Sequence, residues 1–467
     1  MVYPFLFKKK GDNGSPVIVR EVNIMTPKEV ILKRVEDEDV RFIRLQFTDM
    51  LGQMRNMAIT VDRLEEALEN RCVFDGSAID GFANIEESDL YLHPDPTTFA
   101  IFPWRPHNGK VARLICDVYT PDGKPLEYNP RLVLERVVKE AEDMGYKLKI
   151  GPEIEFFLFN TDESGRPTTE TNDSGSYFDM APLDNGENVR RDICLTLEEM
   201  GYTIEASHHE MAHGQHEIVF KEDDALVTAD RIVTFRTVVK TIAKRSGLHA
   251  TFMPKPFADE WGSGMHLTMH LEKDGENVFA FNETTNKFRN ETYRFIAGLL
   301  RYTREIVCLT NPTVNSYKRF IPGADAPYHI SWSENNRSLL IRAIRSRVPE
   351  DSSIEYRSPD PTANPYLAIA AILKAGLKGL KDDSIILPPS IGMNVNELSK
   401  NDLTMLGIER MPVSLNEALQ IAKRSELVEE LLGKNLKDSY IAKKETEYDL
   451  YRRTISKWEL DRYLVQY

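Results

Sequence analysis

The stretch GPEIEFFLF, from Gly151 to Phe159, places two glutamates inside an otherwise apolar run. Residues two apart in a β-strand point to the same side of the sheet, so Glu153 and Glu155 share a face with two phenylalanines. If that face is buried, two carboxylates are buried with it, and buried charges without a partner are very costly. The stretch therefore predicts either a cation beside the two glutamates or a strand whose glutamate end emerges into water.

The bulk composition is that of a globular protein with more than one domain. The chain has 467 residues, 41% of them hydrophobic and 28% charged, and a single core rarely grows that large. The formal net charge of −14 argues against a nucleic-acid partner, because phosphate binding relies on clustered Lys and Arg. The chain has no apolar run of about 18 residues, so we expect no membrane span. Its four cysteines lack C-x-x-C spacing, which is typical of a reduced, cytoplasmic protein.

Local patterns divide the chain into three parts. Residues 1–20 include KKKGDNGSP and are expected to form a flexible extension. Residues 21–125 predict a small α/β unit of alternating strands and one helix. Pro130 opens a helix that stops at Gly145, so a second unit is predicted to span residues 126–467. We expect the aromatic end of the chain, YRRTISKWELDRYLVQY, to dock on another subunit.

Three further stretches collect side chains that can bind metal ions or anions. Residues 205–220, EASHHEMAHGQHEIVF, contain four of the ten histidines of the chain among three glutamates. Residues 262–270 read GSGMHLTMH, and residues 353–361 read SIEYRSPDP, with a glutamate and an arginine two apart. Carboxylate and imidazole suit Mg²⁺ or Mn²⁺. The competing interpretation is a set of hydrogen-bonded core histidines, because spacing alone does not show that the stretches converge.

Taken together, these stretches resemble a type I glutamine synthetase over roughly residues 47–370. The matching segments are FTD, FDGSAIDGF, IEESDLYL, GPEIEFFLF, ASHHEMAHGQHEI, LHATFMPKP, GSGMH, TNPTVNSYKRFIPG, NRS and E-x-R-S-P-D-P-T-A-N-P-Y-L. The resemblance implies an α+β fold, with an amino-terminal β-grasp domain followed by a catalytic domain that has a curved antiparallel sheet and flanking helices. It also implies a homo-oligomer, a dodecamer of two hexameric rings.

The activity implied by the resemblance is ATP-dependent ligation of ammonium to the γ-carboxylate of glutamate. The reaction runs through γ-glutamyl phosphate and yields glutamine, ADP and phosphate. Two divalent ions, Mg²⁺ or Mn²⁺, are implied per site, and they supply the cation that the opening stretch calls for. The first ion would be held by Glu155, Glu210 and Glu217, and the second by Glu153, His266 and Glu355. Without the ions, close carboxylates would repel by about 4 kcal/mol per pair at an effective dielectric constant near 20.

The remaining site residues are implied by the same resemblance. The substrate-binding residues are Gly262, Arg319, Arg337 and Arg357. The ATP-binding residues are Glu205, His208 and Arg342. The catalytic residues are Asp49, Asp325 and Arg337, of which Asp49 is expected to reach a neighbouring subunit and help to deprotonate ammonium.

Several positions depart from the family pattern around the amine and nucleotide pockets. Asp325 stands where the family flap usually has a glutamate, and Trp261 stands where an asparagine is common. Ser353 occupies the place of a frequent arginine near ATP. The alternative function is therefore a γ-glutamyl-amine ligase that uses a larger amine. A third hypothesis, a catalytically silent structural homologue, requires lost metal ligands, yet all six are present.

Overall fold

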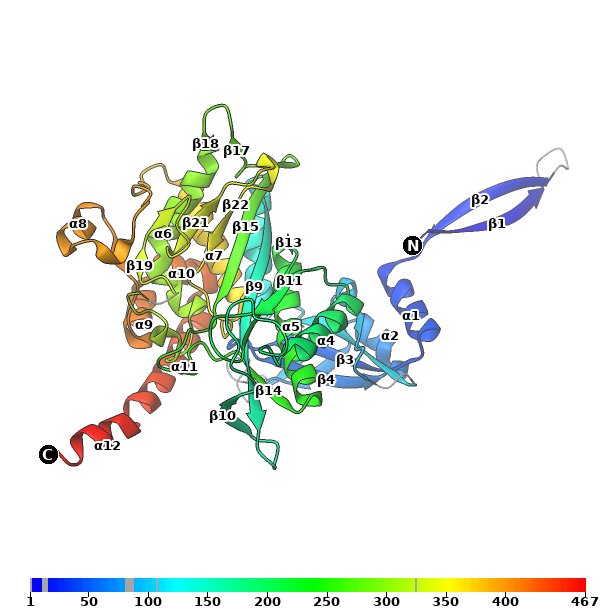
Figure 1. The fold of residues 1–467 in the computed structure, drawn as a ribbon. Coiled ribbons are helices and arrows are strands. Elements are labelled where there is room, and N and C mark those ends of the chain that lie inside the picture. Colours follow the sequence, from blue (N-terminus) through cyan, green and yellow to red (C-terminus); the bar gives the residue numbers. More distant parts are fainter. Residues whose placement is uncertain (1, 11–15, 80–87, 106–107, 324–325) are drawn as a thin grey trace. The chain divides into compact units, whose positions relative to one another are not determined.

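The computed structural model describes residues 2–10, 16–79, 88–105, 108–323 and 326–467 (Figure 1). Contacts between residues divide the chain into two compact units. The smaller unit ends at Leu126. The larger unit runs from Glu127 to Tyr467 and also includes Thr48–Gln53. Among the described residues, no helix combines the length and the apolar character that crossing a membrane requires.

The start of the chain forms a hairpin of two antiparallel strands, β1 (Val2–Lys10) and β2 (Pro16–Ile24). A flexible extension was expected over residues 1–20, and it stays a prediction. The run PVIVREVNI is rich in β-branched residues, which are enriched in strands.

A mixed sheet forms the body of the smaller unit, in the order β4–β3–β8–β6–β5, with β7 paired to β8. Strands β3 and β8 run parallel, while β8, β6 and β5 pair in antiparallel fashion. Ile43 and Leu45 of β3 are fully buried, as is Leu114 of β8. The elements are α1 (Pro27–Asp37), β3 (Val40–Thr48), β4 (Met54–Thr60), α2 (Leu64–Leu68), β5 (Cys72–Asp75), β6 (Asp89–Pro94), β7 (Ala100–Ile101) and β8 (Lys110–Tyr119).

The larger unit is built on a sheet in the order β11–β12–β9–β15–β22–β21–β20, and every neighbouring pair except β21–β20 is antiparallel. The predicted α+β class with an antiparallel catalytic sheet is confirmed. The strands on this path are β9 (Lys147–Thr161), β11 (Ile204–His209), β12 (Gln215–Phe220), β15 (Met265–Lys273), β20 (Trp332–Ser333), β21 (Ile341–Ile344) and β22 (Ser353–Tyr356).

Shorter strands complete the sheets of this unit. Strands β10 (Pro167–Thr171), β13 (Asp223–Asp224) and β14 (Leu248–Thr251) pair with β9, and β16 (Glu276–Asn277) pairs with β15. Two separate pairs are β17 (Phe281–Asn282) with β18 (Lys287–Phe288), and β19 (His329–Ile330) with β23 (Glu409–Arg410).

Helices surround this sheet, and several pack directly against it. Helices α3 and α5 contact β9, and α7 contacts α3, α5 and α6. Gly298 allows α6 to approach α7 closely, since a Cβ atom there would lie 2.4 Å from Ala375 O. The helices are α3 (Pro130–Asp143), α4 (Glu187–Glu199), α5 (Ala225–Arg245), α6 (Asn290–Thr310), α7 (Pro365–Lys381), α8 (Lys400–Met405), α9 (Leu415–Arg424), α10 (Glu426–Leu432), α11 (Lys434–Arg452) and α12 (Lys457–Tyr463).

Both faces of β9 are buried, but by different partners. One face packs under α5, where the Phe156 and Phe235 ring centroids lie 6.3 Å apart. On the other face, Glu155 is only 4% exposed. The glutamate face is therefore buried at Glu155, which excludes a strand that simply emerges into water there. The apolar cluster farther along this face contains Phe157, Phe159, Ala212, Phe257 and Trp261.

Candidate active site

The register of the larger sheet brings the predicted metal ligands onto one face. Glu217 of β12 lies directly opposite Glu155 of β9, and His266 of β15 lies directly opposite Glu153 of β9. Glu355 of β22 lies opposite the residue two positions after His266. Directly opposed residues, and residues two apart, point to the same side of a sheet. All five side chains therefore share one face.

One group of donor atoms on this face comes from Glu153, His266 and Glu355, whose ligand atoms lie within 4.8 Å of one another. Nδ1 of His266 is 3.8 Å from a carboxylate oxygen of each glutamate. This distance is too long for a hydrogen bond, but it is within the roughly 4.2 Å that two ligands span across one Mg²⁺ ion. Among the described residues, the buried Nε2 of His266 has no hydrogen-bond partner. The donor set fits Mg²⁺ or Mn²⁺.

A second group consists of His208, Glu210 and Glu217. Nε2 of His208 lies 3.2 Å from Glu217 Oε1. Burial lowers the pKa of His208, but Glu217 and Glu210 outweigh this effect and raise the pKa above its ordinary value. Glu155 was expected in this group, and His208 was expected beside the nucleotide. In the structure, the His208 ring lies among the carboxylates, and Glu155 faces Glu217 across the strand pair.

Arginine side chains lie beside the first group. Nη1 of Arg357 donates a 2.6 Å hydrogen bond to Glu355 Oε1, and Nη1 of Arg342 is 3.6 Å from Glu355 Oε2. Burial raises the pKa of Glu153, but the adjacent imidazole and the charges of Arg357 and Arg337 bring it below its ordinary value. Arg342 and Arg357 thus place positive charge beside Glu355 that anionic substrate groups can use.

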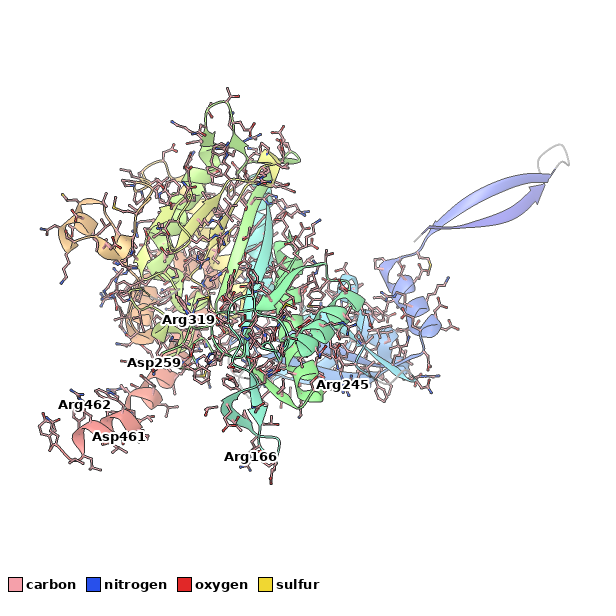
Figure 2. The ribbon with its side chains drawn as sticks, in the orientation of Figure 1. Arg166, Arg245, Asp259, Arg319, Asp461 and Arg462 are labelled. Carbon is pink, nitrogen blue, oxygen red and sulfur yellow. The ribbon has the colours of Figure 1, made fainter. Side chains whose placement is uncertain are left out.

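A cavity of about 340 Å³ adjoins the site and is formed partly by Arg319 and Gly262. Arg319 is 3% exposed and donates to the Ser358 carbonyl at 3.2 Å. Figure 2 shows its side chain within the larger unit, together with Asp259, which also lines the cavity. Gly262 must lack a side chain, because a Cβ atom there would lie 2.5 Å from Pro254 O. The cavity has the size and the guanidinium group that a small amino acid requires.

A larger hollow, of about 940 Å³, opens beside Glu153 and is lined by Glu205, Ser353 and His270. Its position next to the candidate metal ligand is the one that a nucleoside triphosphate would need, since divalent ions bridge its phosphates. Glu205, a predicted ATP-binding residue, lines this hollow, and its role stays a prediction.

Of the two predicted catalytic aspartates, the structure describes Asp49 alone. Asp49 is fully buried, and its Oδ1 accepts hydrogen bonds from the backbone N–H groups of Leu51 at 3.0 Å and Gln53 at 2.9 Å. Nδ2 of Asn364, the N-cap of α7, donates to the Asp49 carbonyl at 3.2 Å. Asp49 therefore sits in a turn that belongs to the larger unit. Asp325 lies outside the described residues, and its role stays a prediction.

Comparison with known proteins identifies the family. Residues 127–463 match the model described as "Glutamine synthetase, catalytic domain", and residues 39–121 match "Glutamine synthetase, beta-Grasp domain". The chain belongs to the glutamine synthetase family. The resemblance found in the sequence is confirmed, and so is the β-grasp domain that it implied.

Similar proteins within the glutamine synthetase family cover nearly the whole chain. A glutamine synthetase of Clostridium saccharobutylicum is 52% identical over 441 residues, which is 94% of this chain and 99% of that protein. A glutamine synthetase of Staphylococcus aureus (strain Mu50 / ATCC 700699) is also 52% identical, over 94% of this chain and 98% of that protein.

Solved structures match the fold as well. One titled "GmaS/ADP complex-Conformation 1" has a TM-score of 0.83 and 30% identity, and the match covers 93% of this chain and 99% of that one. A cryo-EM structure of Plasmodium falciparum glutamine synthetase has a TM-score of 0.82, covers 95% of this chain and 99% of that one, and at 23% identity supports the fold alone.

The alternative of a larger amine is not favoured in this glutamine synthetase family member. The relatives at 52% identity are named glutamine synthetases. Trp261, which motivated the alternative, lines the small cavity but also packs against the apolar cluster that covers Phe157. Its presence is therefore explained at least in part by packing.

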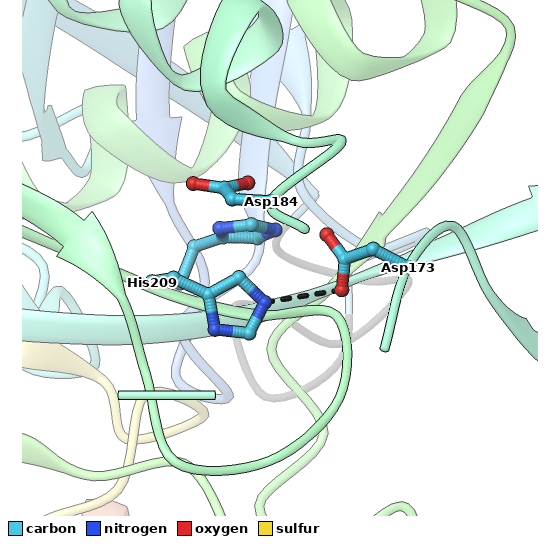
Figure 3. Close-up of side chains that lie close together, drawn as sticks. Asp173, Asp184 and His209 are labelled. Carbon is cyan, nitrogen blue, oxygen red and sulfur yellow. Dashed lines mark hydrogen bonds and ion pairs between the residues drawn. The ribbon is translucent and has the colours of Figure 1, made fainter. Parts of the chain in front are cut away.

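A third group of potential ligands consists of Asp173, Asp184, His209 and His216 (Figure 3). Nη1 of Arg190 approaches both Asp184 Oδ2, at 2.8 Å, and His216 Nδ1, at 2.9 Å. A guanidinium group can only donate, so Nδ1 of His216 accepts and its Nε2 carries the proton. Burial, with Arg190 and His209 nearby, lowers the pKa of His216 well below its ordinary value. The His216 ring is thus neutral and has no lone pair left for a metal ion.

The His209 ring, unlike the His216 ring, has a hydrogen-bond acceptor beside each of its nitrogens. Its Nδ1 lies 2.7 Å from the Glu210 carbonyl and its Nε2 lies 3.0 Å from Asp173 Oδ1. Both neighbours accept hydrogen bonds, so both ring nitrogens must donate, and the ring carries a positive charge. Burial lowers the pKa of His209, but Asp173 and the Glu210 carbonyl raise it above its ordinary value. Two cations, His209 and Arg190, thus neutralise the two carboxylates, and this group is a closed structural network.

Several residues near the site escaped the sequence analysis. Tyr177 lies near the second group, because its ring centroid is 5.6 Å from that of His208. The Phe178 ring centroid is 4.6 Å from that of His208. The pattern SYFDM gave no periodic signal for either aromatic residue. Gln215 was also missed, although it stands inside the quoted segment ASHHEMAHGQHEI.

Proposed function

We propose that this protein is a glutamate–ammonia ligase that makes glutamine from glutamate, ammonium and ATP. The observation that supports this most directly is the register of β12, β9, β15 and β22, which gathers carboxylates and an imidazole from distant segments on one sheet face. The γ-phosphoryl group of ATP is transferred to a γ-carboxylate oxygen of glutamate. Ammonia then attacks the acyl carbon, and phosphate leaves with its electron pair.

Two divalent ions, Mg²⁺ or Mn²⁺, would polarise the phosphates and offset charge as the phosphoryl group moves. We propose that Glu153, His266 and Glu355 hold one ion, and that Glu155, Glu210 and Glu217 hold the other. His208 lies beside the second set, and its proposed partner is the nucleotide. Arg342 and Arg357 offset part of the negative charge at Glu355.

The proposed substrate contacts follow from the two cavities. Arg319 and Gly262 bind glutamate in the small cavity, and Arg337 and Arg357 face the γ-glutamyl phosphate. Glu205, His208 and Arg342 contact ATP. Asp49 from a neighbouring subunit and Asp325 from the flap take the proton that ammonium must lose before it can attack.

We further propose a dodecamer of two hexameric rings that acts in the cytoplasm. Helix α12 projects away from the rest of its unit (Figures 1 and 2), and Trp458 and Tyr467 on this arm are 61% and 93% exposed. Large exposed aromatic residues mark an interaction surface. All four cysteines are free, three of them buried, which agrees with a reducing compartment.

Purified protein tests this proposal through phosphate release and product analysis. With ATP and Mg²⁺, we expect release that depends on both glutamate and ammonium and that forms glutamine in equal amount. A panel that includes methylamine, ethylamine and putrescine should support much slower release. Glutamate-dependent release that prefers one of the larger amines would contradict the proposed amine, and no glutamate-dependent release at all would contradict the reaction.

A further inference from the structure

Gln215, the first residue of β12, is 1% exposed, and its polar groups contact several parts of the site. Its Nε2 donates to Glu155 Oε2 at 2.7 Å and to the Gly262 carbonyl at 3.2 Å. Its Oε1 accepts from Ala212 N at 3.0 Å, and its backbone carbonyl accepts from Glu210 N at 2.7 Å. Glu155 and Gly262 are acceptors and Ala212 N is a donor, so only one orientation of the amide fits.

The carboxylate of Glu155 is held from two sides. Oε2 accepts from Gln215 Nε2 and also from Gly264 N, at 3.0 Å. Two donors on one oxygen fix the rotation of the carboxylate group, and hence the direction in which its other oxygen points. Partners that orient a ligand in this way commonly change metal affinity by about 10- to 100-fold when they are removed.

The same amide also holds the loop of the small cavity. The Gly262 carbonyl is the second acceptor of Gln215, and Gly262 itself lines the 340 Å³ cavity beside Arg319. Gly264, two residues along, donates to Glu155. One buried NH₂ group therefore joins a candidate metal ligand to the wall of the candidate glutamate cavity.

We propose that Gln215 is a positioning residue that couples binding of the divalent cation at Glu155 to binding of glutamate in the small cavity. The inference rests on the proposed function of these two sites. An amide with this reach donates to a carboxylate and to a carbonyl while its own oxygen accepts from Ala212 N, which a side chain with donors alone cannot do. A glutamate at this position would turn an acceptor toward two acceptors, and a methionine would fill the space without donating.

The test measures Mn²⁺ binding to the full-length, assembled protein, with and without saturating glutamate. In the wild type, glutamate should strengthen Mn²⁺ binding, and by linkage Mn²⁺ should lower the KM for glutamate by the same factor where KM reports binding. In Gln215→Met, we expect Mn²⁺ to bind at least about tenfold more weakly at one site. The factor by which glutamate strengthens Mn²⁺ binding should fall toward one.

Tyr440→Phe is the matched control, because Tyr440 is buried and donates a hydrogen bond of the same length, 2.7 Å, to the Cys308 carbonyl. It should lower the melting temperature yet leave Mn²⁺ affinity and its dependence on glutamate unchanged. If Gln215→Met does not assemble, Gln215→Asn replaces it, since asparagine keeps the amide but cannot reach both acceptors.

The outcomes separate this inference from the proposed function. Unchanged Mn²⁺ affinity and unchanged dependence on glutamate in the Gln215 variant, in a protein whose wild type ligates glutamate, overturn the positioning role alone. A wild type whose Mn²⁺ binding does not respond to glutamate also overturns the coupling. A wild type that neither binds Mn²⁺ nor releases phosphate with glutamate overturns the proposed function itself.

Discussion

Glu155 and Glu217 lie directly opposite each other on the antiparallel strands β9 and β12. Like charges in this relationship destabilise a sheet, and both side chains are buried, at 4% and 7% exposure. Under the proposed function, a bound cation offsets this repulsion. Predictions about metal binding follow from this relationship.

Replacing Glu217 by glutamine should lower kcat by at least about a hundredfold, because an amide oxygen binds a hard cation more weakly than a carboxylate does. In the presence of EDTA, and at a pH high enough for the His208 ring beside Glu217 to be neutral, the same change should raise the melting temperature, since it removes the repulsion with Glu155. Steady-state kinetics and calorimetry measure the two effects. Glu163→Gln, at an exposed turn, is the control, and wild-type kcat in Glu217→Gln would rule out the ligand role.

Divalent ions should stabilise the wild type. An ion that binds only the folded state at a hundred times its Kd adds about 2.7 kcal/mol per site to the free energy of unfolding. Titration with Mn²⁺ should thus raise the melting temperature progressively. His266→Gln should remove one of the two binding events seen by isothermal titration calorimetry. If neither Mn²⁺ nor Mg²⁺ changes the melting temperature of the wild type, the two-ion proposal is contradicted.

The third group predicts a pH dependence of stability. Burial raises the pKa of Asp173, but His209 and the Gly214 N–H outweigh it and lower the pKa to about 2. Because the folded-state pKa lies below the unfolded value of about 3.9, the carboxylate stabilises the fold above pH 4, and this contribution is lost as the pH falls toward 2. Asp173→Asn should cost about 2 kcal/mol near pH 6 and almost nothing near pH 2.

Denaturant unfolding at a series of pH values measures this difference. Asp192→Asn, on an exposed surface of α4, is the control, and its free energy of unfolding should equal that of the wild type at every pH. A difference between Asp173→Asn and the wild type that stays constant down to pH 2 would show that the Asp173 carboxylate does not account for it.

Removal of the residues from Trp458 onward should shift the protein to smaller assemblies. The deletion removes the exposed apolar side chains of the arm, which we propose pack against another subunit. Leu464→Asp should have the same effect. Ile386→Asp is the matched control, since Ile386 is also exposed, at 85% against 74% for Leu464, but lies outside the arm. Sedimentation velocity measures the assembly, and an unchanged large species in both arm variants would contradict the proposal.

Much of the candidate metal-binding face could be predicted from sequence, but not its detailed grouping. Alternation within a strand placed Glu153 and Glu155 on one face, and the family pattern named the other ligands. The position of His208 among the carboxylates was missed, because it depends on the pairing of β11 with β12 and of β12 with β9. Gln215 was missed for a similar reason, since its acceptors Glu155 and Gly262 lie far from it along the chain.

The sequence by itself determined which side chains share a face within each strand, because the two-residue period of a strand is set by backbone geometry alone. It also determined the family, through many short segments in a fixed order. Only the tertiary structure decided which strands are neighbours and in what register, since that depends on packing both faces of β9 at once. A shift of one residue between β9 and β12 would turn Glu217 away from Glu155. The same long-range packing made Asp173, Asp184, His209 and Arg190 a neutral network rather than a third metal site.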